Sequence, residues 1–550
     1  MVICVLVVIA YEILKGTHRI PLVIFCLGLS LIYQTSMLGQ YVVGIDIHKE
    51  LYTAMQSVEH GWDLSWTSDY NTSWVLGFLT PLLARVGLDP IWQFKLLYPA
   101  VFAFVPVIMF LVYRKLLDDK KAFLASSLLF MSPTFYLETP TIVKTLVAQT
   151  FLALTLFFLV SDIPKAKKIL GLIICITGAV TAHYTIAVII TSALLGCTAL
   201  TTLVTRKVNL TLLTSTGTAL VVLVAWFGTV GNGVMLENLK YTVKGVFVTA
   251  TSPLYYKPPD ATSSSSPVEL YVTSDDPRQE ILDRTQPTAR GSYLDAQEPL
   301  VRTALGLDFN EASILGKIFR ILQYSVQVLA IVGCFALWKT RKKLPLIYCM
   351  LEVVAVLLLL MCVFVPFFSA TVSITRFYQI ALMILAPVIV LGITLLFEKH
   401  WTIIVMVVIF PYFVFTSGLP FELSHNTTMS FVDTPYSFGL SNYRIDSVGV
   451  FNQEDRDTAT YVSQMTRTLP VYMDYQSYTL TQGINEGYGM SGWTHSAKPP
   501  YILFLNSWNT THNELVYGRN SGLRYYEPLP DLTNATEIFR RGDAVVYQVQ

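Results

Sequence analysis

Charged residues are scarce in this sequence, and their scarcity excludes an ordinary soluble enzyme. Only 14% of the 550 residues are Asp, Glu, Lys or Arg, against about 25% in an average soluble protein, whereas 53% are hydrophobic. The charges nearly cancel, because 38 Lys and Arg stand against 37 Asp and Glu. The chain therefore has no global field that would attract nucleic acid, and we expect most of it to lie in lipid.

Cysteine is also scarce and shows no metal-binding or redox spacing. All seven cysteines fall in apolar runs, which marks them as small core residues rather than disulfide partners or metal ligands. They are Cys4, Cys26, Cys175, Cys197, Cys334, Cys349 and Cys362. No internal repeat of fixed period is evident, and no Trp-Trp-Asp motif occurs in the chain.

Long apolar runs are what the sequence has in abundance. A membrane-spanning helix needs about 20 apolar residues, and we count about twelve candidates. They lie near 1–14, 20–38, 96–113, 122–137, 141–160, 169–182, 185–204, 208–229, 315–337, 344–366, 377–397 and 401–417. The predicted fold is thus a polytopic α-helical membrane domain over residues 1–417. The first run lacks a small-residue cleavage site, which favours a retained helix over a removed signal peptide; a truncated start is the alternative.

The basic residues of the short loops predict the orientation of these spans. Sixteen basic residues lie on one set of alternating short loops, and only Lys49, Arg85, Lys95 and Arg376 lie on the other set. Because basic loops stay in the cytoplasm, we expect a multi-pass cell-membrane protein with both termini outside. Four of five Asn-X-Ser/Thr sequons, at Asn71, Asn426, Asn509 and Asn534 but not Asn209, fall on the predicted outer side.

Three long polar segments share that outer side. Residues 39–95 include an apolar stretch, Trp74 to Val86, that we expect to lie in the interface or re-enter the membrane. Residues 230–314 carry a serine-rich patch, Thr262 to Pro267, typical of a mobile linker or lid. Residues 418–550 predict a small α/β or α+β extracytoplasmic domain. Its elements are a helix over 454–467 and strands over 469–475, 501–505 and 544–549.

The first cluster of candidate site residues follows the second span. If the stretch from Gly44 to Glu50 is helical, Asp46 and Glu50 share a face while His48 points elsewhere. Two carboxylates at a membrane surface suit a general base acting on a hydroxyl, or a divalent metal with His48 as third ligand. The alternative is an interfacial helix whose charges are simply solvated.

Further ionisable residues flank other spans at the same side. Glu138 and Lys144 border a short turn, where they could pair with each other or Lys144 could bind an anion. His183 and Tyr184 occupy a bend between two spans, as a ligand contact or a structural pair. Arg376 begins the eleventh span, where a guanidinium binds phosphate or snorkels to lipid headgroups.

Two polar residues lie deeper in the spans. Gln149, one turn below Lys144, is expected to make a helix-packing hydrogen bond. Glu352, inside the tenth span, is expected to pair with a nearby lysine at the cytoplasmic end.

Taken together, the pattern resembles the GT-C fold glycosyltransferases, which are polytopic enzymes that use polyprenyl-phosphate sugar donors. The resemblance lies in the acidic motif Gly44-Ile45-Asp46-Ile47-His48-Lys49-Glu50 after a span, the break at His183, the outer Arg376 and the C-terminal domain. The Asp-Ile-His-x-Glu signature is similar to one in a group of uncharacterised archaeal membrane proteins. The lack of Trp-Trp-Asp argues against en bloc transfer of a glycan to sequons.

The resemblance implies roles for the candidate residues. Asp46 would be the catalytic base, with Glu50 as alternative base or ligand, and Lys144 and Arg376 would bind the donor phosphate. His48, Glu138, His183 and Tyr184 would contact substrate. The resemblance does not decide whether a cofactor is used, and a Mg²⁺ or Mn²⁺ ion held by Asp46, His48 and Glu50 is one alternative. The expected partners are a polyprenyl (dolichyl) phosphate sugar, membrane lipid and a glycan or protein acceptor, with inverting transfer of a hexosyl or related sugar.

Two other classes of protein remain as alternatives. A transporter or flippase for lipid-linked or polar solutes would also be polytopic, although such proteins often show related halves and charges near the membrane midplane. A non-catalytic surface-assembly protein would use residues 418–550 to bind partners.

Overall fold

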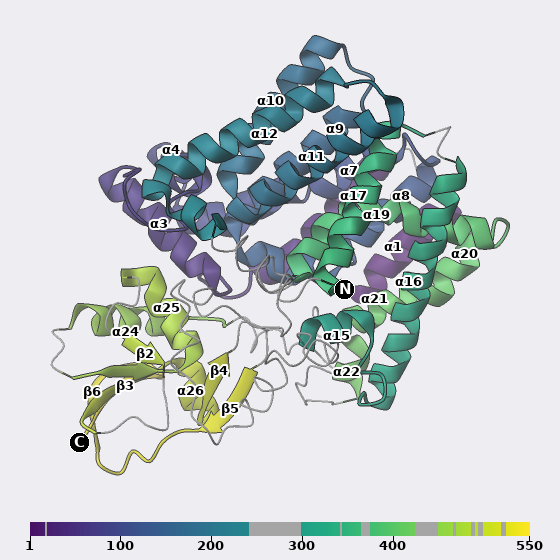
Figure 1. The fold of residues 1–550 in the computed structure, drawn as a ribbon. Helices are drawn as coiled ribbons and strands as arrows, with labels where there is room; N and C mark the ends of the chain where they lie inside the picture. The colour runs from purple at the N-terminus through teal and green to yellow at the C-terminus, as the bar shows by residue number, and fades with distance from the viewer. Residues whose placement is uncertain are drawn as a thin grey trace, which may run out of the picture.

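The computed structural model describes residues 1–16, 19–240, 299–340, 344–364, 374–424, 449–465, 469–485, 490–492, 499–518 and 524–550. It consists of a large helical bundle and a smaller C-terminal domain with a sheet (Figure 1). Most of the predicted loop 230–314, including the patch from Thr262 to Pro267, lies outside the described residues.

Each of the twelve predicted spans coincides with helical structure. The apolar helices of the bundle are α1 (Val2–Leu14), α2 (Ile20–Ser36), α6 (Tyr98–Phe102), α7 (Val105–Tyr113), α8 (Asp119–Phe130), α9 (Val143–Val160), α10 (Lys165–Ala182), α11 (Tyr184–Thr205), α12 (Leu210–Thr229), α16 (Ile314–Thr340), α17 (Leu346–Phe364), α19 (Ile374–Leu396), α20 (Trp401–Ile404) and α21 (Phe410–Thr416). Among the described residues, seven helical segments are long and apolar enough to cross a membrane. The chain is thus a multi-pass membrane protein by composition and length, whereas a count of about twelve spans is not confirmed.

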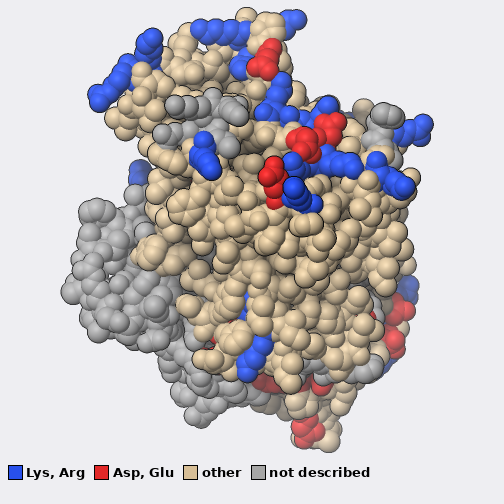
Figure 2. All heavy atoms as spheres, turned by 90° about the vertical axis from the view of Figure 1, so that its right-hand side faces the viewer, with Lys and Arg blue, Asp and Glu red and all other residues tan. Residues whose placement is uncertain are grey.

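Shorter helices connect and cover the bundle. They are α3 (Asp46–His60), α4 (Thr80–Arg85), α5 (Pro90–Trp92), α15 (Pro299–Leu305) and α22 (Leu419–Leu423), with the short turns η1 (Val75–Leu79), η2 (Gln93–Leu97), η3 (Thr134–Glu138), η4 (Thr139–Thr141), η5 (Val230–Gly233) and η10 (Val405–Ile409). The stretch expected to lie in the interface forms η1 and α4, an apolar segment too short to span. It leaves Phe78 and Leu82 exposed. On the face shown in Figure 2, charged side chains gather mainly at one end, and a broad band below them is almost free of charge.

Two neighbouring helices fix α19, the helix that carries Arg376, at the point where an internal proline interrupts its backbone hydrogen bonds. Pro387 has no N–H to donate, so it leaves the carbonyl of Met383 without its helical partner. The Tyr113 hydroxyl of α7 donates to that carbonyl at 2.8 Å, and the Tyr348 hydroxyl of α17 donates to the next carbonyl, of Ile384, at 2.5 Å. The kink-prone helix is therefore held in place by two neighbouring helices.

The C-terminal domain combines helices with a mixed sheet, which fits the predicted choice between an α/β and an α+β unit. Its five-stranded sheet has the order β2-β1-β3-β7-β6, in which β1 pairs in parallel with β2 and β3, while β7 pairs antiparallel with β3 and β6. Tyr501 pairs with Val549, and Val471 with Ile502. Its elements are α24 (Gln453–Gln464), β1 (Val471–Met473), α25 (Tyr475–Asn485), β2 (Met490–Gly492), β3 (Tyr501–Leu505), α26 (Ser507–His512), β4 (Glu514–Gly518), β5 (Arg524–Pro528), β6 (Ala535–Arg541) and β7 (Ala544–Val549), with β4 and β5 forming a separate hairpin.

The two parts meet where α25 packs against α3 (Figure 1). The Arg456 guanidinium lies 4.8 Å from the ring of Tyr41, in the loop before α3, and the Tyr41 hydroxyl bonds to Gln453. The C-terminal domain therefore covers the segment that leads into the first candidate motif.

Candidate functional site

The loop before Asp46 is held by a buried lysine. Lys95 donates hydrogen bonds from Nζ to the backbone carbonyls of Leu38, Gly39 and Tyr41, at 3.1, 3.0 and 2.7 Å. Gly44 then adopts a φ of +124°, and a Cβ there would lie 2.4 Å from the Thr141 side chain. Only glycine fits such a turn against η4, so the chain enters α3 with Asp46 at its first position.

Asp46 contacts a cation and a phenol from two other parts of the chain. Its Oδ2 lies 3.5 Å from Nη2 of Arg376, and its Oδ1 accepts a hydrogen bond from the Tyr70 hydroxyl at 3.3 Å. The Asp46 and Arg376 side chains remain 35% and 32% exposed. Both groups are therefore ordered by each other and still open to an incoming ligand.

Glu50, one turn further along α3, is buried against the start of α9. Its Oε2 accepts a hydrogen bond from the backbone N–H of Val143 at 2.6 Å, at the start of α9. Its Oε1 lies 3.8 Å from Nζ of Lys144. Burial raises the pKa of Glu50 to about 7, although the Lys144 charge acts in the opposite direction. Glu50 thus holds the lysine in place rather than facing an open space.

Lys144 also lies over an aromatic ring that links it to Asp46. Its Nζ is 3.9 Å from the centroid of Tyr70 and 5.8 Å from that of Tyr184. Burial raises the pKa of the Tyr70 phenol well above its ordinary value, so at neutral pH Tyr70 is a hydrogen-bond donor to Asp46. Of the two alternatives for Lys144, pairing with Glu138 is wrong, because the ammonium pairs with Glu50 instead.

Glu138 lies on the other side of Arg376. Its Oε2 accepts a hydrogen bond from Oγ1 of Thr375 at 2.7 Å, and its charge interacts with the Arg376 guanidinium. Burial raises the pKa of Glu138. Arg376 is therefore flanked by Asp46 and Glu138, and its Nε is buried without a hydrogen-bond partner among the described residues.

His183 caps the helix that contributes Tyr184. The backbone N–H groups of Thr185 and Ile186 donate to His183 Nδ1 at 3.2 and 3.5 Å, so the neutral ring carries its proton on Nε2. The His183 ring stacks on Tyr184 with centroids 5.0 Å apart. This is a structural cap at a break between α10 and α11, placed within electrostatic range of Lys144.

His48 points away from the other residues of its motif. Its ring lies edge-on to Phe451, with centroids 5.5 Å apart, and a Cβ at Gly483 would lie 3.3 Å from its Nδ1. Burial, with a smaller effect of the Arg456 charge, lowers the pKa of His48 to about 4. His48 is thus a neutral packing residue between α3 and the C-terminal domain.

The expected metal set is not brought together. Asp46, His48 and Glu50 face Arg376, Phe451 and Lys144 respectively. Within the described part of the chain, no group of three or more His, Cys, Asp or Glu is arranged to hold a metal ion. We therefore derive no chemistry through a metal.

Seven residues form what we call the polar cluster. They are Asp46, Glu50, Tyr70, Glu138, Lys144, Tyr184 and Arg376, from five separate segments. Sequence reasoning missed Tyr70 and gave no role to Thr375. The only signal for Tyr70 was the richness of loop 39–95 in Trp and Tyr, which does not single out one ring. Thr375 directly precedes Arg376 and could have been suspected from that position alone.

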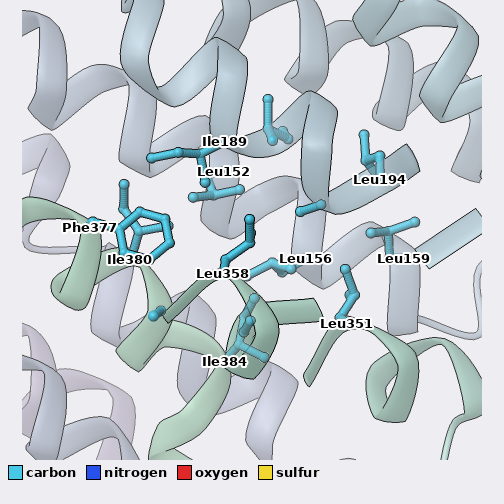
Figure 3. A pocket seen from close by; sticks show the side chains of 14 residues that line it. Leu152, Leu156, Leu159, Ile189, Leu194, Leu351, Leu358, Phe377, Ile380 and Ile384 are labelled. Atoms are coloured by element: carbon cyan, nitrogen blue, oxygen red, sulfur yellow. The ribbon is translucent and has the colours of Figure 1, made fainter. Parts of the chain in front are cut away.

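A small apolar pocket lies between four helices of the bundle, three of which also carry residues of the polar cluster (Figure 3). All fourteen residues that line it are apolar and come from α9, α11, α17 and α19. They are Leu152, Leu156, Leu159, Ile189, Ile190, Ala193, Leu194, Leu351, Ala355, Leu358, Phe377, Ile380, Ala381 and Ile384. Phe377 directly follows Arg376, and Leu152 lies about 12 Å along α9 from Lys144 at 1.5 Å per residue.

Two deeper polar side chains differ from expectation. Neither amide atom of Gln149 and neither carboxylate oxygen of Glu352 has a hydrogen-bond partner among the described residues, although both residues are buried. The helix-packing hydrogen bond of Gln149 and the lysine partner of Glu352 are thus not found.

Comparison with known proteins gives a family model and several solved structures. The model described as "Predicted membrane protein (DUF2206)" matches residues 304–547, which is less than half of the chain. That range contains Arg376 but not Asp46 or Lys144. No curated protein sequence matches the chain.

The similar solved structures include two membrane proteins studied with lipid phosphates. The apo oligosaccharyltransferase of Archaeoglobus fulgidus has a TM-score of 0.46 at 9% identity, over 92% of this chain and 74% of that one. The same archaeal enzyme, AglB, with an inhibitory peptide and a dolichol-phosphate gives 0.43 at 9% identity and the same coverage. ArnT of Cupriavidus metallidurans, bound to undecaprenyl phosphate, gives 0.34 at 11% identity, over 96% and 97% of the two chains. Because these TM-scores are below 0.5, we base the proposal below on the residues of this chain alone.

Proposed function

We propose that the protein is a glycosyltransferase that moves a sugar from a polyprenyl phosphate donor to an acceptor at the outer face of the cell membrane. The observation that carries this proposal is that two helices combine a cation of the polar cluster with apolar lining of one pocket. Arg376 and Lys144 stand at the starts of α19 and α9, and side chains further along the same helices line the pocket. A lipid phosphate joins an anionic head to an apolar tail, and these match in kind the cationic and the apolar parts of the two helices.

The donor phosphate is assigned to Arg376 and Lys144. Arg376 has a buried Nε without a hydrogen-bond partner among the described residues, which is unusual for a group that binds oxygen so strongly. A phosphate is the natural partner because the planar guanidinium can bind it with two parallel hydrogen bonds. Lys144, held by Glu50 and Tyr70, adds a second positive charge.

Asp46 is assigned as the general base. In the proposed step, the acceptor oxygen attacks C1 of the sugar while Asp46 takes the proton from that oxygen. The bond between C1 and the phosphate oxygen breaks, its electron pair stays on that oxygen, and the configuration at C1 inverts. The products are the glycosylated acceptor and polyprenyl phosphate, whose growing negative charge is met by Arg376 and Lys144.

The outer location rests on the charge asymmetry of the short loops. The polar cluster lies at the end of the bundle that contacts the C-terminal domain, and the positive-inside rule assigns that end to the outside. Both termini and the C-terminal domain would then be extracytoplasmic.

The test uses the purified full-length chain in lipid vesicles. Dolichyl or undecaprenyl phosphate binding is measured by native mass spectrometry, and transfer by release of polyprenyl phosphate from a radiolabelled sugar donor with a membrane extract as acceptor source. Wild type should bind the lipid phosphate and release product, and Arg376→Gln should lose binding. The exposed Arg85→Gln serves as matched control. Equal binding by both variants would refute the assignment of the phosphate site.

One observation favours the transporter alternative. Glu352 lies two turns inside α17, 2% exposed, with both carboxylate oxygens unpartnered among the described residues. Intramembrane carboxylates are common in transport pathways. If vesicles accumulate a lipid-linked or polar solute without forming a transfer product, and Glu352→Gln stops this uptake, transport replaces transfer as the function.

A further inference from the structure

The five sequons differ in whether their asparagine can be reached. An N-linked glycan needs an exposed Asn whose side-chain amide is free to react. Four of the five, all but Asn426, lie within the described residues. Hydrogen bonds occupy the amide nitrogens of Asn71 and Asn509, the predicted topology separates Asn209 from the outer side, and Asn534 is exposed.

Asn71 and its surroundings form a closed turn. The side chain is fully buried, and Nδ2 donates both of its hydrogens, to the carbonyls of Asp63 at 2.7 Å and Trp66 at 2.9 Å. Its Oδ1 accepts a hydrogen bond from the Trp62 indole at 2.9 Å. Asn71 therefore organises the loop and has no free amide hydrogen.

Asn509 is committed in the same way inside the C-terminal domain. It is fully buried, and Nδ2 donates to Oδ2 of Asp474 at 2.8 Å and to the carbonyl of Glu514 at 3.0 Å. Its Oδ1 accepts from the backbone N–H of Asn506 at 3.0 Å. A glycan on this nitrogen would require the domain core to open.

Asn209 is the N-cap of α12. Its Oδ1 accepts hydrogen bonds from the backbone N–H groups of Thr211 and Leu212 at 3.0 and 3.3 Å. The basic residues Arg206 and Lys207 beside it belong to the loops that the charge asymmetry assigns to the cytoplasm.

Asn534 differs from these three because it lies at an exposed turn. The turn is closed by the N–H of Ala535 donating to the carbonyl of Leu532, and by the N–H of Thr533 donating to Asp531. Asn534 and the sequon Thr536 are both exposed. Thr536 lies in β6, the edge strand of the sheet (Figure 1), so one side of the sequon is free of neighbouring strands.

We propose that Asn534 is an N-glycosylation site of this protein. In the reaction, Nδ2 of Asn534 forms a bond to C1 of a sugar supplied by a lipid-linked oligosaccharide. The bond between C1 and the donor's phosphate oxygen breaks, the phosphate keeps the electron pair, and the proton that the amide loses passes to a basic group of the cell's transferring enzyme. This modification is independent of the transfer activity proposed above, since here the chain is the acceptor and not the catalyst.

The experiment is glycopeptide mapping of the full chain, expressed in a cell that glycosylates sequons outside its membrane, with a reference glycoprotein made in the same culture. We expect a glycan on the peptide containing Asn534, and none on those containing Asn71, Asn209 or Asn509. Asn534→Gln should lose one glycan mass, whereas Asn509→Gln should lose none. An unmodified Asn534 beside a modified reference protein overturns the proposal.

A second measurement separates accessibility from topology. Thr533→Cys places a thiol in the same exposed turn, whereas the seven natural cysteines lie in apolar runs. A membrane-impermeant thiol reagent should label the new cysteine in intact cells. Failure to label before lysis would put the C-terminal domain in the cytoplasm, which also overturns the proposal. Labelling without a glycan at Asn534 would show that exposure alone does not make this sequon an acceptor.

Discussion

The C-terminal domain and the polar cluster bury acidic side chains in opposite ways. In the domain, Asp474 accepts hydrogen bonds on both oxygens, from Ser477, Asn509 and Val516. Asp455 in α24 is likewise bonded on both oxygens. In the cluster, Glu50 has one oxygen with only a 3.8 Å ion pair, and Arg376 Nε has no hydrogen-bond partner among the described residues.

This difference separates groups that serve folding from groups that await a ligand. A buried network whose members are all satisfied stabilises one conformation, and removing a member destabilises that conformation. Buried polar atoms without partners cost free energy and therefore call for a specific explanation. A bound phosphate would supply the missing partner for Arg376. Variants in the two regions should accordingly fail differently, the first in stability and the second in activity.

The largest effect is expected for Asp46→Asn. The amide keeps the size of the side chain but cannot accept the acceptor's proton, so the transfer rate should fall by about 10²–10⁴-fold. The thermal midpoint should change little, because the partly exposed pair with Arg376 contributes little to stability. The measurement is release of polyprenyl phosphate from a labelled donor, with Glu59→Gln on the same helix as control. Transfer at the wild-type rate would remove Asp46 from the role of base.

Arg376→Gln should have the next largest effect. Without the guanidinium, the leaving phosphate loses its main stabilising charge, and transfer should fall by about 10²–10³-fold. Lipid phosphate affinity should fall with it, because the same charge binds the ground state. Arg85→Gln, at an exposed position near the same end of the bundle, should leave both properties unchanged. If Arg376→Gln strongly lowers the thermal stability together with lipid phosphate binding, Arg376 belongs instead with the residues that serve folding.

Asp474→Ala tests the buried acidic side chains of the C-terminal domain. It leaves Nδ2 of Asn509 and the backbone N–H groups of Ser477 and Val516 without their acceptor, at a cost of about 2–3 kcal/mol. The unfolding transition of the C-terminal domain, followed by near-UV circular dichroism, should shift to lower temperature, while lipid phosphate binding stays unchanged. Loss of binding in a folded Asp474→Ala protein would show that the two regions are coupled.

The secondary structure could be predicted well in the segments where it follows from the apolar composition. The apolar runs give the helices of the bundle, because hydrocarbon demands internally hydrogen-bonded backbone, and short runs rich in apolar residues give β3 and β7 of the C-terminal domain. The number of complete spans could not be predicted, since helices such as α1 and α21 are apolar yet shorter than a span. Whether such a helix crosses, tilts or packs inside depends on its neighbours.

The residues of the candidate site could be predicted from the sequence better than the contacts between them. Rare charges beside apolar helices pointed to Asp46, Lys144 and Arg376, which the structure does bring together. Which group pairs with which depends on the three-dimensional path of five segments, so the partner of Lys144 could not be read from spacing. Tyr70 could not be predicted for the same reason, because its loop contains many aromatic residues and the sequence does not distinguish this one from the others.

The smallest effect in this comparison is a pH dependence caused by Glu50. Burial raises its pKa from the ordinary value of 4.5 to about 7 in the folded protein, so the fold favours the protonated form. The contribution of Glu50 to the free energy of unfolding is therefore fully present below pH 4.5 and is lost as the pH rises through 7.

Glu50→Gln does not titrate, so wild type should lose stability relative to this variant between pH 4.5 and 7, with no further change above that range. Thermal midpoints of wild type, Glu50→Gln and the exposed Glu59→Gln at four pH values from 5 to about 8 measure this difference. If the Glu50→Gln and wild-type curves run parallel, Glu50 is charged throughout this pH range and the expected pH dependence is wrong.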